Sequence, residues 1–438
     1  MSTPTHRSSA SGSPFQLFAA TAPGLESITA AELVKRDEGS GTRDAGWVRG
    51  KQERGGVSFS GNLETLYRAN LWLRTASRVL VRLGRFHAST FYELERRAKK
   101  IAWEEFLPAT GSVEVRVTCR KSRLYHSDAV AERVLSAIAR VAPPSLNLQF
   151  DESADEDGTA EQGEETGKAV PNGDATDRSQ SFVVRIVDDQ CEVSADASGE
   201  LLHRRGYRQE IAKAPLRETL AAAMVLASGW QKNQPLIDPM CGSGTIPIEA
   251  ALIARRVAPG LARGFQFMKW PSFDERVWNE IVETAKASII NPPLEIRGAD
   301  RDSGAIEAAA RNAQRAGVAD AIRFSAESVS GSFAALEDVA DGEGWIITNP
   351  PYGIRVGDGA DLRDLYATLG GGIKTKRGWR IGILAADDGL AGQLRLPMRS
   401  RFDTRNGGIP VSYLVSERVE GRDSNSRRTA VGSRKQEG

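Results

Sequence analysis

The fold is decided by the stretch Ile237-Asp238-Pro239-Met240-Cys241-Gly242-Ser243-Gly244-Thr245. A short buried strand, Leu236–Asp238, runs into a glycine turn, and a helix over Ile246–Arg256 follows. Two glycines let the backbone approach a ligand without a Cβ clash, at a helix N-terminus that favours polar ligands. No Lys-Ser or Lys-Thr follows, so this is not a phosphate loop, and the dinucleotide fingerprint is incomplete. The pattern therefore predicts a ligand-binding strand–turn–helix unit.

Strands and helices alternate on either side of this unit, from about His203 onward. A helix over Ser303–Ala316 has Ser303 as its expected cap and Gly317 just past its end. The alternation predicts an α/β fold with a mostly parallel, doubly wound sheet, whose ligands lie at the carboxyl ends of the strands. The further strands that we expect are Leu294–Ala299, Ile322–Ser325, Trp345–Thr348, Arg380–Ala385 and Val411–Val415.

Three acidic residues stand at the ends of successive strands. Asp238 suits a cationic or hydroxyl-bearing group, such as the amino-acid end of S-adenosylmethionine. Asp300 is placed to accept hydrogen bonds from ribose hydroxyls, and Glu327 to meet an adenine amino group. Because Asp300 follows Asp238 by 62 residues, more than one helix needs, Ala258–Pro293 must be an insertion with its own helix. The expected cofactor-binding residues are Asp238, Cys241, Gly242, Gly244, Thr245, Asp300 and Glu327. No histidine is near Cys241 in the sequence, so we interpret its thiol as a packing group, not a nucleophile.

A rigid turn, Asn349-Pro350-Pro351-Tyr352, follows the fourth strand. Two consecutive prolines cannot continue a strand. The Asn349 amide oxygen and the Pro350 carbonyl offer two acceptors for a planar exocyclic amine, and Tyr352 can stack on its ring. We therefore expect Asn349, Pro350, Pro351 and Tyr352 to form the catalytic turn.

The first half of the chain has the mixed pattern of a smaller α+β region. The expected strands are Phe15–Ala20, Gly56–Ser60, Ala76–Leu83, Val113–Cys119, Leu146–Phe150, and a hairpin of Phe182–Val187 with Cys191–Ala195 around Asp188-Asp189. The expected helices are Leu25–Val34, Leu63–Ala69, Thr90–Phe106 and Ser127–Val141.

Charge is unevenly distributed along the 438 residues. Residues 151–180 carry ten acidic and two basic residues, a charge of −8, whereas the whole chain has a net charge of +1, which leaves +9 for the rest. The basic remainder indicates nucleic acid as a partner. The acidic stretch is too polar to pack and is expected to be a disordered insertion. We expect the same of residues 1–14 and of the basic tail 419–438.

Several classes of protein are excluded by composition. The three cysteines and four histidines are scattered, which argues against a disulfide framework or a metal site and favours a reducing, cytoplasmic location. No apolar run is long enough to span a membrane, and residues 1–14 lack the apolar core of a secretory signal. Nothing indicates an obligate protein partner.

The joint motif set resembles a known enzyme family. Asp238–Thr245 and Asn349–Tyr352 look like two motifs of class I S-adenosylmethionine-dependent amino-methyltransferases. The stretches Ser198–Arg208, Lys213–Ala221 and Lys121–Ser127 resemble the THUMP-containing RNA guanine-N2 methyltransferases, which include the RlmL-type enzymes. The likeness extends over residues 15–418, although Glu327 stands where the family usually has Asp.

The resemblance implies a domain order and a function. It implies a ferredoxin-like unit at 15–85, a THUMP-like RNA-binding domain at 86–202 and a Rossmann-like methyltransferase domain at 203–418, with S-adenosylmethionine as cofactor and no metal. The implied reaction is methylation of guanosine N2, in large-subunit ribosomal RNA or alternatively in transfer RNA. Two other hypotheses remain: a non-catalytic RNA-binding assembly factor, and a DNA adenine-N6 methyltransferase with the same Asn-Pro-Pro-Tyr turn.

Overall fold

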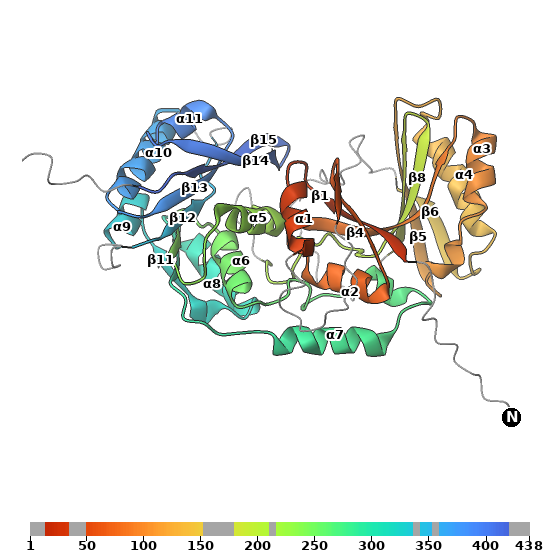
Figure 1. The fold of residues 1–438 in the computed structure, drawn as a ribbon, viewed down its shortest axis with the longest axis horizontal. Helices are drawn as coiled ribbons and strands as arrows, with labels where there is room; N and C mark the ends of the chain where they lie inside the picture. The colour runs from red at the N-terminus through yellow and green to blue at the C-terminus, as the bar shows by residue number, and fades with distance from the viewer. Residues whose placement is uncertain are drawn as a thin grey trace, which may run out of the picture.

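The computed structural model describes residues 14–34, 50–151, 179–209, 216–335, 342–352 and 359–419. They form two lobes side by side along the long axis of the molecule (Figure 1). Most of the expected disordered segments, 1–14, 151–180 and 419–438, lies outside the described residues.

The N-terminal lobe is built on one eight-stranded sheet. Its strands are β1 (Phe15–Thr21), β2 (Lys51–Glu53), β3 (Gly56–Gly61), β4 (Ala76–His87), β5 (Gly111–Arg120), β6 (Leu146–Phe150), β7 (Gln180–Val187) and β8 (Gln190–Asp196), in the order β2-β3-β1-β4-β8-β7-β5-β6. The antiparallel pairing of β4 with β8 joins the expected ferredoxin-like and THUMP-like units into one sheet. The expected boundary between residues 85 and 86 thus falls inside β4.

Helices pack on one face of this sheet, over the apolar residues that alternate along its strands. They are α1 (Glu26–Val34), α2 (Leu63–Trp72), α3 (Phe91–Ala98) and α4 (Ser127–Ala139). In β5, Val113, Val115 and Val117 are buried in the core beneath the helices, as the period-2 pattern predicts. Asp188 and Asp189 both have positive φ, 50° and 58°, which confirms the tight hairpin turn between β7 and β8.

Two predictions in this lobe are wrong. The single helix expected over Thr90–Phe106 is instead α3 followed by a separate 3₁₀ turn, η2 (Trp103–Glu105). The chain breaks there because the Trp103 ring is buried in the core and its indole N–H donates to the carbonyl of Ala98, 2.9 Å away. The predicted end of the acidic insertion, residue 180, is also wrong, because Gln180 begins β7. Its side chain is fully buried and accepts a hydrogen bond from the indole of Trp270 at 2.7 Å.

The C-terminal lobe has the mostly parallel, doubly wound sheet that the sequence predicts, and it contains seven strands. Its strands are β9 (Leu236–Asp238), β10 (Ile296–Asp300), β11 (Ile322–Ala326), β12 (Trp345–Thr348), β13 (Arg380–Ala385), β14 (Met398–Asn406) and β15 (Ile409–Ser416), in the order β11-β10-β9-β12-β13-β15-β14. All run parallel except β15, which is antiparallel to both of its neighbours. The order reverses between β9 and β12, where ligands bind in folds of this kind.

Helices cover both faces of this sheet. They are α5 (Glu218–Ser228), α6 (Thr245–Ala254), α8 (Ser303–Arg315), α9 (Val329–Ala334), α10 (Gly359–Lys374) and α11 (Asp388–Gly392). The cap predicted for α8 is wrong by one residue, because Asp302, not Ser303, accepts from the backbone N–H groups of Gly304 and Ala305. Gly317 follows the helix with φ of 69°, as predicted.

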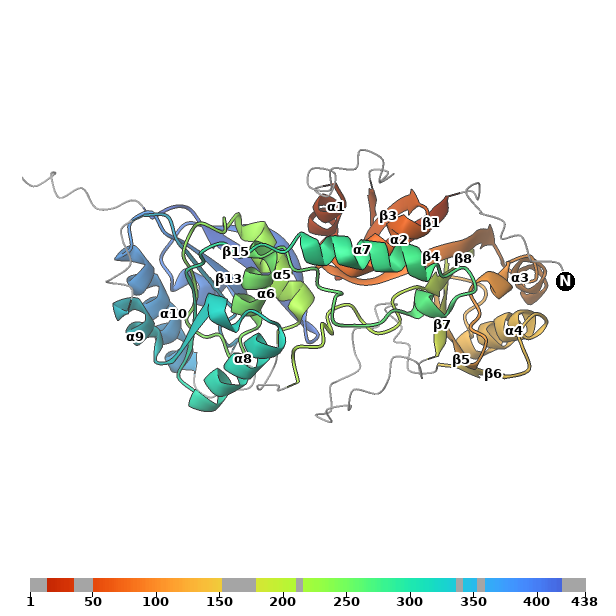
Figure 2. The same ribbon diagram turned by 90° about the horizontal axis from the view of Figure 1, so that it is seen from below.

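The insertion after α6 contains its own helix, as predicted, but it packs on the other lobe. Helix α7 (Glu275–Ala287) lies beside α2 in both views (Figures 1 and 2). Phe267, within the 3₁₀ turn η4 (Gln266–Lys269), is fully buried and stacks on Tyr67 of α2 with ring centroids 4.6 Å apart. The insertion is therefore part of the N-terminal core.

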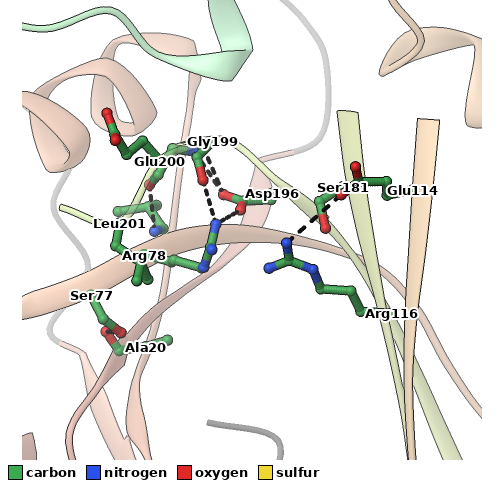
Figure 3. Close-up of polar contacts among 12 residues, drawn as sticks. Ala20, Ser77, Arg78, Glu114, Arg116, Ser181, Asp196, Gly199, Glu200 and Leu201 are labelled. Carbon is green, nitrogen blue, oxygen red and sulfur yellow. Dashed lines mark hydrogen bonds and ion pairs between the residues drawn. The ribbon is translucent and has the colours of Figure 1, made fainter. Parts of the chain in front are cut away.

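Buried polar groups fix the segment that connects the lobes. Arg78 of β4 binds the carboxylate of Asp196 and the carbonyl of Gly199 (Figure 3). Deeper in the junction, Arg205 donates to the carbonyl of Arg74 at 2.6 Å and lies 3.5 Å from the Glu249 carboxylate of α6. Because buried ions are stable only when paired, these contacts hold the lobes in one arrangement.

Candidate cofactor site and active site

The carboxyl ends of β9 and β12 are joined by a side-chain hydrogen bond. The Thr348 hydroxyl donates to the Asp238 carboxylate at 2.6 Å, and the Met240 backbone N–H donates to the same oxygen at 3.2 Å. Thr348 is fully buried and Asp238 is 1% exposed. These bonds fix the strand end from which the glycine turn begins.

Burial changes the acidity of Asp238. It raises the pKa of this carboxyl to about 7, with a smaller contribution from the negative charge of Asp300, while the hydrogen bonds from Thr348 and Met240 act in the opposite direction. Asp238 therefore fixes the start of the turn through its hydrogen bonds and also places a carboxyl group of raised pKa in the site.

The glycine turn needs both of its glycines. Gly242 has φ of 51° and Gly244 has φ of 84°, in the left-handed region that favours glycine. A Cβ on Gly244 would lie 2.9 Å from the Cβ of Ala309 on α8. The turn is therefore pressed against α8, and α6 begins directly after it at Thr245, whose side chain is buried.

Asp300, at the end of β10, braces the same turn. One carboxylate oxygen accepts from the Gly242 backbone N–H at 3.0 Å, and the other accepts from the Asp302 N–H at 3.0 Å. The side chain is only partly buried. Asp300 can therefore hold the turn and still present oxygen lone pairs to a ligand.

Glu327 follows β11 and lies beside Asp300. Its backbone N–H donates to the Asp300 carbonyl at 2.9 Å, and its carboxylate accepts from the Ser325 hydroxyl at 2.5 Å. Three neighbouring strand ends, β9, β10 and β11, thus each supply a carboxyl group to one edge of the sheet.

The Cys241 thiol is buried in the turn. Burial and the negative charges of Asp238 and Asp300 raise its pKa well above the ordinary value, so the thiol stays protonated. The sulfur packs against β10, since a Cβ added to Gly298 would lie 3.2 Å from it. This environment suits a packing group and disfavours a nucleophile.

Asn349 and Tyr352 meet at the end of β12. The Tyr352 hydroxyl donates a short hydrogen bond to the Asn349 side-chain oxygen and accepts one from the Asn406 amide at 3.4 Å. Burial raises the pKa of Tyr352, so its proton is retained. Pro350 is buried and Pro351 exposed, and no hydrogen bond of the described loops and turns ends on the Pro350 carbonyl.

Three supporting residues were missed by the sequence analysis. Thr348 holds Asp238, Asn406 holds Tyr352, and Asn312, a fully buried side chain of α8, donates to the Ser243 carbonyl of the glycine turn at 3.1 Å. Asn312 carried a weak signal, because asparagine is unfavourable inside a helix. The other two carried none.

Within the described ranges, no group of three or more His, Cys, Asp or Glu side chains is arranged to hold a metal ion. The described helices include none with the length and apolar character of a membrane span.

Comparisons with known proteins divide the chain in the same way. Residues 16–80 match the RlmL ferredoxin-like domain, residues 88–153 the THUMP domain, and residues 205–413 the RMKL-like methyltransferase domain. A Synechocystis protein described as a putative RNA methyltransferase is 35% identical over 91% of this chain and 96% of its own length. The chain belongs to the THUMP-containing RNA methyltransferase family.

A second relative of this RNA methyltransferase is larger. The ribosomal RNA large subunit methyltransferase K/L of Syntrophotalea carbinolica is 35% identical over 93% of the chain, which spans 54% of that protein.

Two solved structures of similar proteins cover nearly the whole methyltransferase. SMU.472, a putative methyltransferase complexed with S-adenosylhomocysteine, has a TM-score of 0.75 and 28% identity, over 94% of this chain and 99% of its own. A Listeria monocytogenes protein described as a predicted N6-adenine-specific DNA methylase has a TM-score of 0.73 and 33% identity, over 92% and 96%. The whole two-lobed arrangement therefore recurs in relatives.

Proposed function

We propose that this RNA methyltransferase transfers the methyl group of S-adenosylmethionine to the exocyclic N2 of a guanosine in large-subunit ribosomal RNA. The observation that carries the proposal is the Asn349–Tyr352 turn, whose acceptors stand one strand away from the Asp238 glycine turn. Residues 203–418 would be the catalytic unit, and the units 15–85 and 86–202 would bind RNA. The cytoplasm is the proposed location, on the cysteine usage described above.

The residues at the sheet edge fit this cofactor. S-adenosylmethionine supplies a methyl group already activated on a sulfonium. The glycine turn offers close approach to backbone, Asp300 offers carboxylate oxygens for ribose hydroxyls, and Glu327 lies where the adenine amino group would be met. Cys241 and Thr245 line the turn by packing, and Asp238 fixes its first residue. The relative SMU.472, which binds the demethylated product of this cofactor, supports the assignment.

The Asn349–Tyr352 turn would activate the target amine by hydrogen bonding. The N2 lone pair of guanine is delocalised into the ring, which makes the nitrogen a poor nucleophile. The two N–H groups of this amine would donate hydrogen bonds to the Asn349 oxygen and the Pro350 carbonyl. These bonds would localise the nitrogen lone pair toward the methyl donor. The Tyr352 hydroxyl uses one lone pair of the Asn349 oxygen, and an amide oxygen has a second one for the substrate.

Positioning then supplies most of the catalysis. Alignment of a bound base with the donor can contribute roughly 7–11 kcal/mol, and stacking on Tyr352 would hold a base that has left its helix. The proton can leave the methylated amine to solvent, so no strong base is needed. The N-terminal lobe would hold the RNA backbone.

One specific observation favours a second candidate. The Listeria relative carries the description of an adenine-N6 DNA methylase, and an Asn-Pro-Pro-Tyr turn can accept any exocyclic amine. The match of residues 88–153 to the THUMP domain favours RNA as the substrate.

Nucleoside mass spectrometry after methyl transfer distinguishes these candidates. Unmodified large-subunit ribosomal RNA, transfer RNA and duplex DNA are each incubated with the protein and S-adenosylmethionine. We expect N2-methylguanosine in ribosomal RNA, and a loss of at least about 100-fold for Asn349→Ala, with cofactor binding kept. N2-methylguanosine found only in transfer RNA would show that transfer RNA, not ribosomal RNA, is the substrate. N6-methyladenine would show that adenine is the target base. An Asn349→Ala variant as fast as wild type would refute the role of the turn.

A further inference from the structure

We propose that Asn406, at the end of β14, is a positioning residue that directs the Tyr352 hydroxyl toward Asn349. This inference rests on the proposed role of Asn349 as an acceptor for the target amine. It concerns a residue that no feature of the catalytic turn itself would reveal, because Asn406 lies 54 residues farther along the chain.

Strand direction brings Asn406 to the site. Because β15 is antiparallel to both β13 and β14, β14 runs in the same direction as β9, β12 and β13. Its last residue therefore lies at the same edge of the sheet as Asp238 and Thr348. Asn406 is only half-buried, so its amide reaches the site from the rim.

The three side chains form a directed chain of hydrogen bonds. The Asn406 amide donates to the Tyr352 oxygen at 3.4 Å, and the Tyr352 hydroxyl donates to the Asn349 oxygen. A phenol has one hydrogen to donate. When its oxygen accepts from Asn406, the hydrogen is left to point at Asn349. The direction of the first bond thus sets the direction of the second.

This chain would keep the Asn349 amide in the orientation that catalysis needs. An asparagine side chain can present either its oxygen or its NH₂ group to a ligand, and only the oxygen can accept from the target amine. A fixed donor at Tyr352 selects the oxygen. Burial holds the Tyr352 hydroxyl in its protonated form, because its pKa lies above the ordinary value.

The hairpin around Asn406 is built to hold one position. Gly407 and Gly408 both have positive φ, 56° and 82°, as a two-residue turn requires, and Arg405 donates to the Gly408 carbonyl at 3.0 Å. Farther back, Phe402 is buried and stacks on Tyr413 with centroids 5.2 Å apart. The hairpin is anchored in the core, so Asn406 has little freedom to leave Tyr352.

The N-terminal lobe also touches this hairpin. Gly24, in the loop before α1, lies so close to β14 that a Cβ there would come within 1.8 Å of the Asp403 carbonyl oxygen. The hairpin extends toward α1 in Figure 1. The lobe proposed to bind RNA is therefore in contact with the strand that carries Asn406.

A double-mutant cycle on the full-length protein tests the inference. Single-turnover methyl transfer into RNA is measured for Asn406→Ala, Tyr352→Phe and the double variant, with calorimetry of S-adenosylmethionine binding as a check on folding. We expect Asn406→Ala to slow transfer about three- to tenfold with unchanged cofactor affinity. The same substitution should have no further effect in the Tyr352→Phe background, because the hydroxyl through which it acts is gone.

Two further variants separate positioning from hairpin stability. Arg405→Ala removes the brace of the same turn without touching Tyr352, and should leave the rate unchanged. Asn406→Asp can only accept from the Tyr352 hydroxyl, so it should turn the proton away from Asn349 and slow transfer at least as much as Asn406→Ala.

Three outcomes would overturn the proposal. These are a wild-type rate for Asn406→Ala, equal losses for Asn406→Ala and Arg405→Ala, or a full loss repeated in the Tyr352→Phe background. Asn349→Ala, run beside them, keeps the two hypotheses apart. If it is slow while Asn406→Ala is not, only the positioning role fails, whereas a wild-type rate for Asn349→Ala removes the proposed function itself.

Discussion

Asp238 and Asp300 end neighbouring strands, but their carboxyl groups have different surroundings. Asp238 is sealed by Thr348 and the turn backbone, whereas Asp300 is partly exposed and receives two backbone N–H groups. Backbone donors stabilise a carboxylate, and burial destabilises one. We therefore expect Asp300 to present its carboxylate oxygens to a ligand, and Asp238 to be the buried carboxyl whose pKa is raised.

The stability of the cofactor-free protein should depend on pH through Asp238. Burial raises its pKa from 3.8 to about 7. Between about pH 4 and 7 the folded chain keeps a proton that the unfolded chain releases, so this residue's contribution to stability falls as pH rises through that window and is constant above it. Asp238→Asn should remove the effect.

The measurement is the difference in thermal midpoint between Asp238→Asn and wild type at pH 5 and pH 8. This difference should shift in favour of the variant at pH 8, by at most about 3 kcal/mol in free energy of unfolding, because only the part of the window between about pH 5 and 7 is crossed. Glu218 has a pKa of about 7 for the same reason, burial, but it is present in both proteins and cancels. A difference that is the same at both pH values would contradict the assignment.

Gly244 should matter to cofactor binding for a reason that Gly317 does not share. Both have positive φ, 84° and 69°, but a Cβ on Gly244 meets Ala309 at 2.9 Å whereas one on Gly317 meets nothing within 4 Å. Each alanine substitution should cost about 1–2 kcal/mol of stability from backbone strain. Only Gly244→Ala should also push the turn from α8 and weaken S-adenosylmethionine binding, by about tenfold or more. Calorimetry that shows equal affinities for the two variants would refute this.

Helices and strands were predicted correctly where a single local constraint produces the sequence pattern. The alternation in Val113–Cys119 and the strand–turn–helix at Asp238 each reflect a local constraint, and both are confirmed. The edge strand β14 was missed because only Phe402 and Thr404 of its nine residues are buried. The helix over Thr90–Phe106 was overextended because the break depends on where Trp103 packs, which is a tertiary fact.

The same limit applies to the site. Asp238, Gly242, Gly244 and Asn349 could be placed at one sheet edge from strand order alone. Thr348 and Asn406 could not be found, because each acts on a residue that only folding brings near.

Removal of the acidic segment should leave the fold intact if the cut respects the ends of the strands. Residues 152–178 carry nine acidic and two basic residues, too polar a composition to stabilise a core. Strands β6 and β7 lie on either side of β5 and both run parallel to it. The replacement linker must therefore cross β5 to reach the start of β7, which takes about a dozen Gly and Ser residues. We expect an unchanged thermal midpoint and, if the segment competes with RNA phosphates, tighter RNA binding with a steeper salt dependence.

A wider deletion, 152–180, is the control. It removes Gln180, whose side chain is fully buried and bonded to Trp270, and should lower the midpoint by several degrees. A cooperative loss of stability in the narrow deletion as well would show that the segment has a structural role.

At the scale of the whole molecule, the two lobes exchange parts of their cores. Leu25, next to α1 in the N-terminal lobe, is 1% exposed and packs in the core of the methyltransferase sheet. In return, the insertion after α6 places aromatic side chains in the N-terminal core, namely Phe265, Phe267, Trp270 and Trp278. Domain boundaries read along the chain therefore differ from the boundaries of packing.

This exchange predicts how a fragment of residues 203–418 will behave. Alone, it exposes the aromatic side chains of the insertion, an apolar patch with no partner, and should aggregate and bind a hydrophobic dye.

The insertion can be removed, because the Ile290 backbone N–H donates to the Arg255 carbonyl at 3.0 Å, so its two ends are adjacent. A fragment in which residues 258–289 are replaced by a three-residue Gly-Ser linker should stay monomeric and bind less dye. Both fragments lack Leu25, so the comparison isolates the insertion. Light scattering and dye fluorescence measure the outcome, and identical behaviour of the two fragments would show that the insertion is not what ties the lobes together.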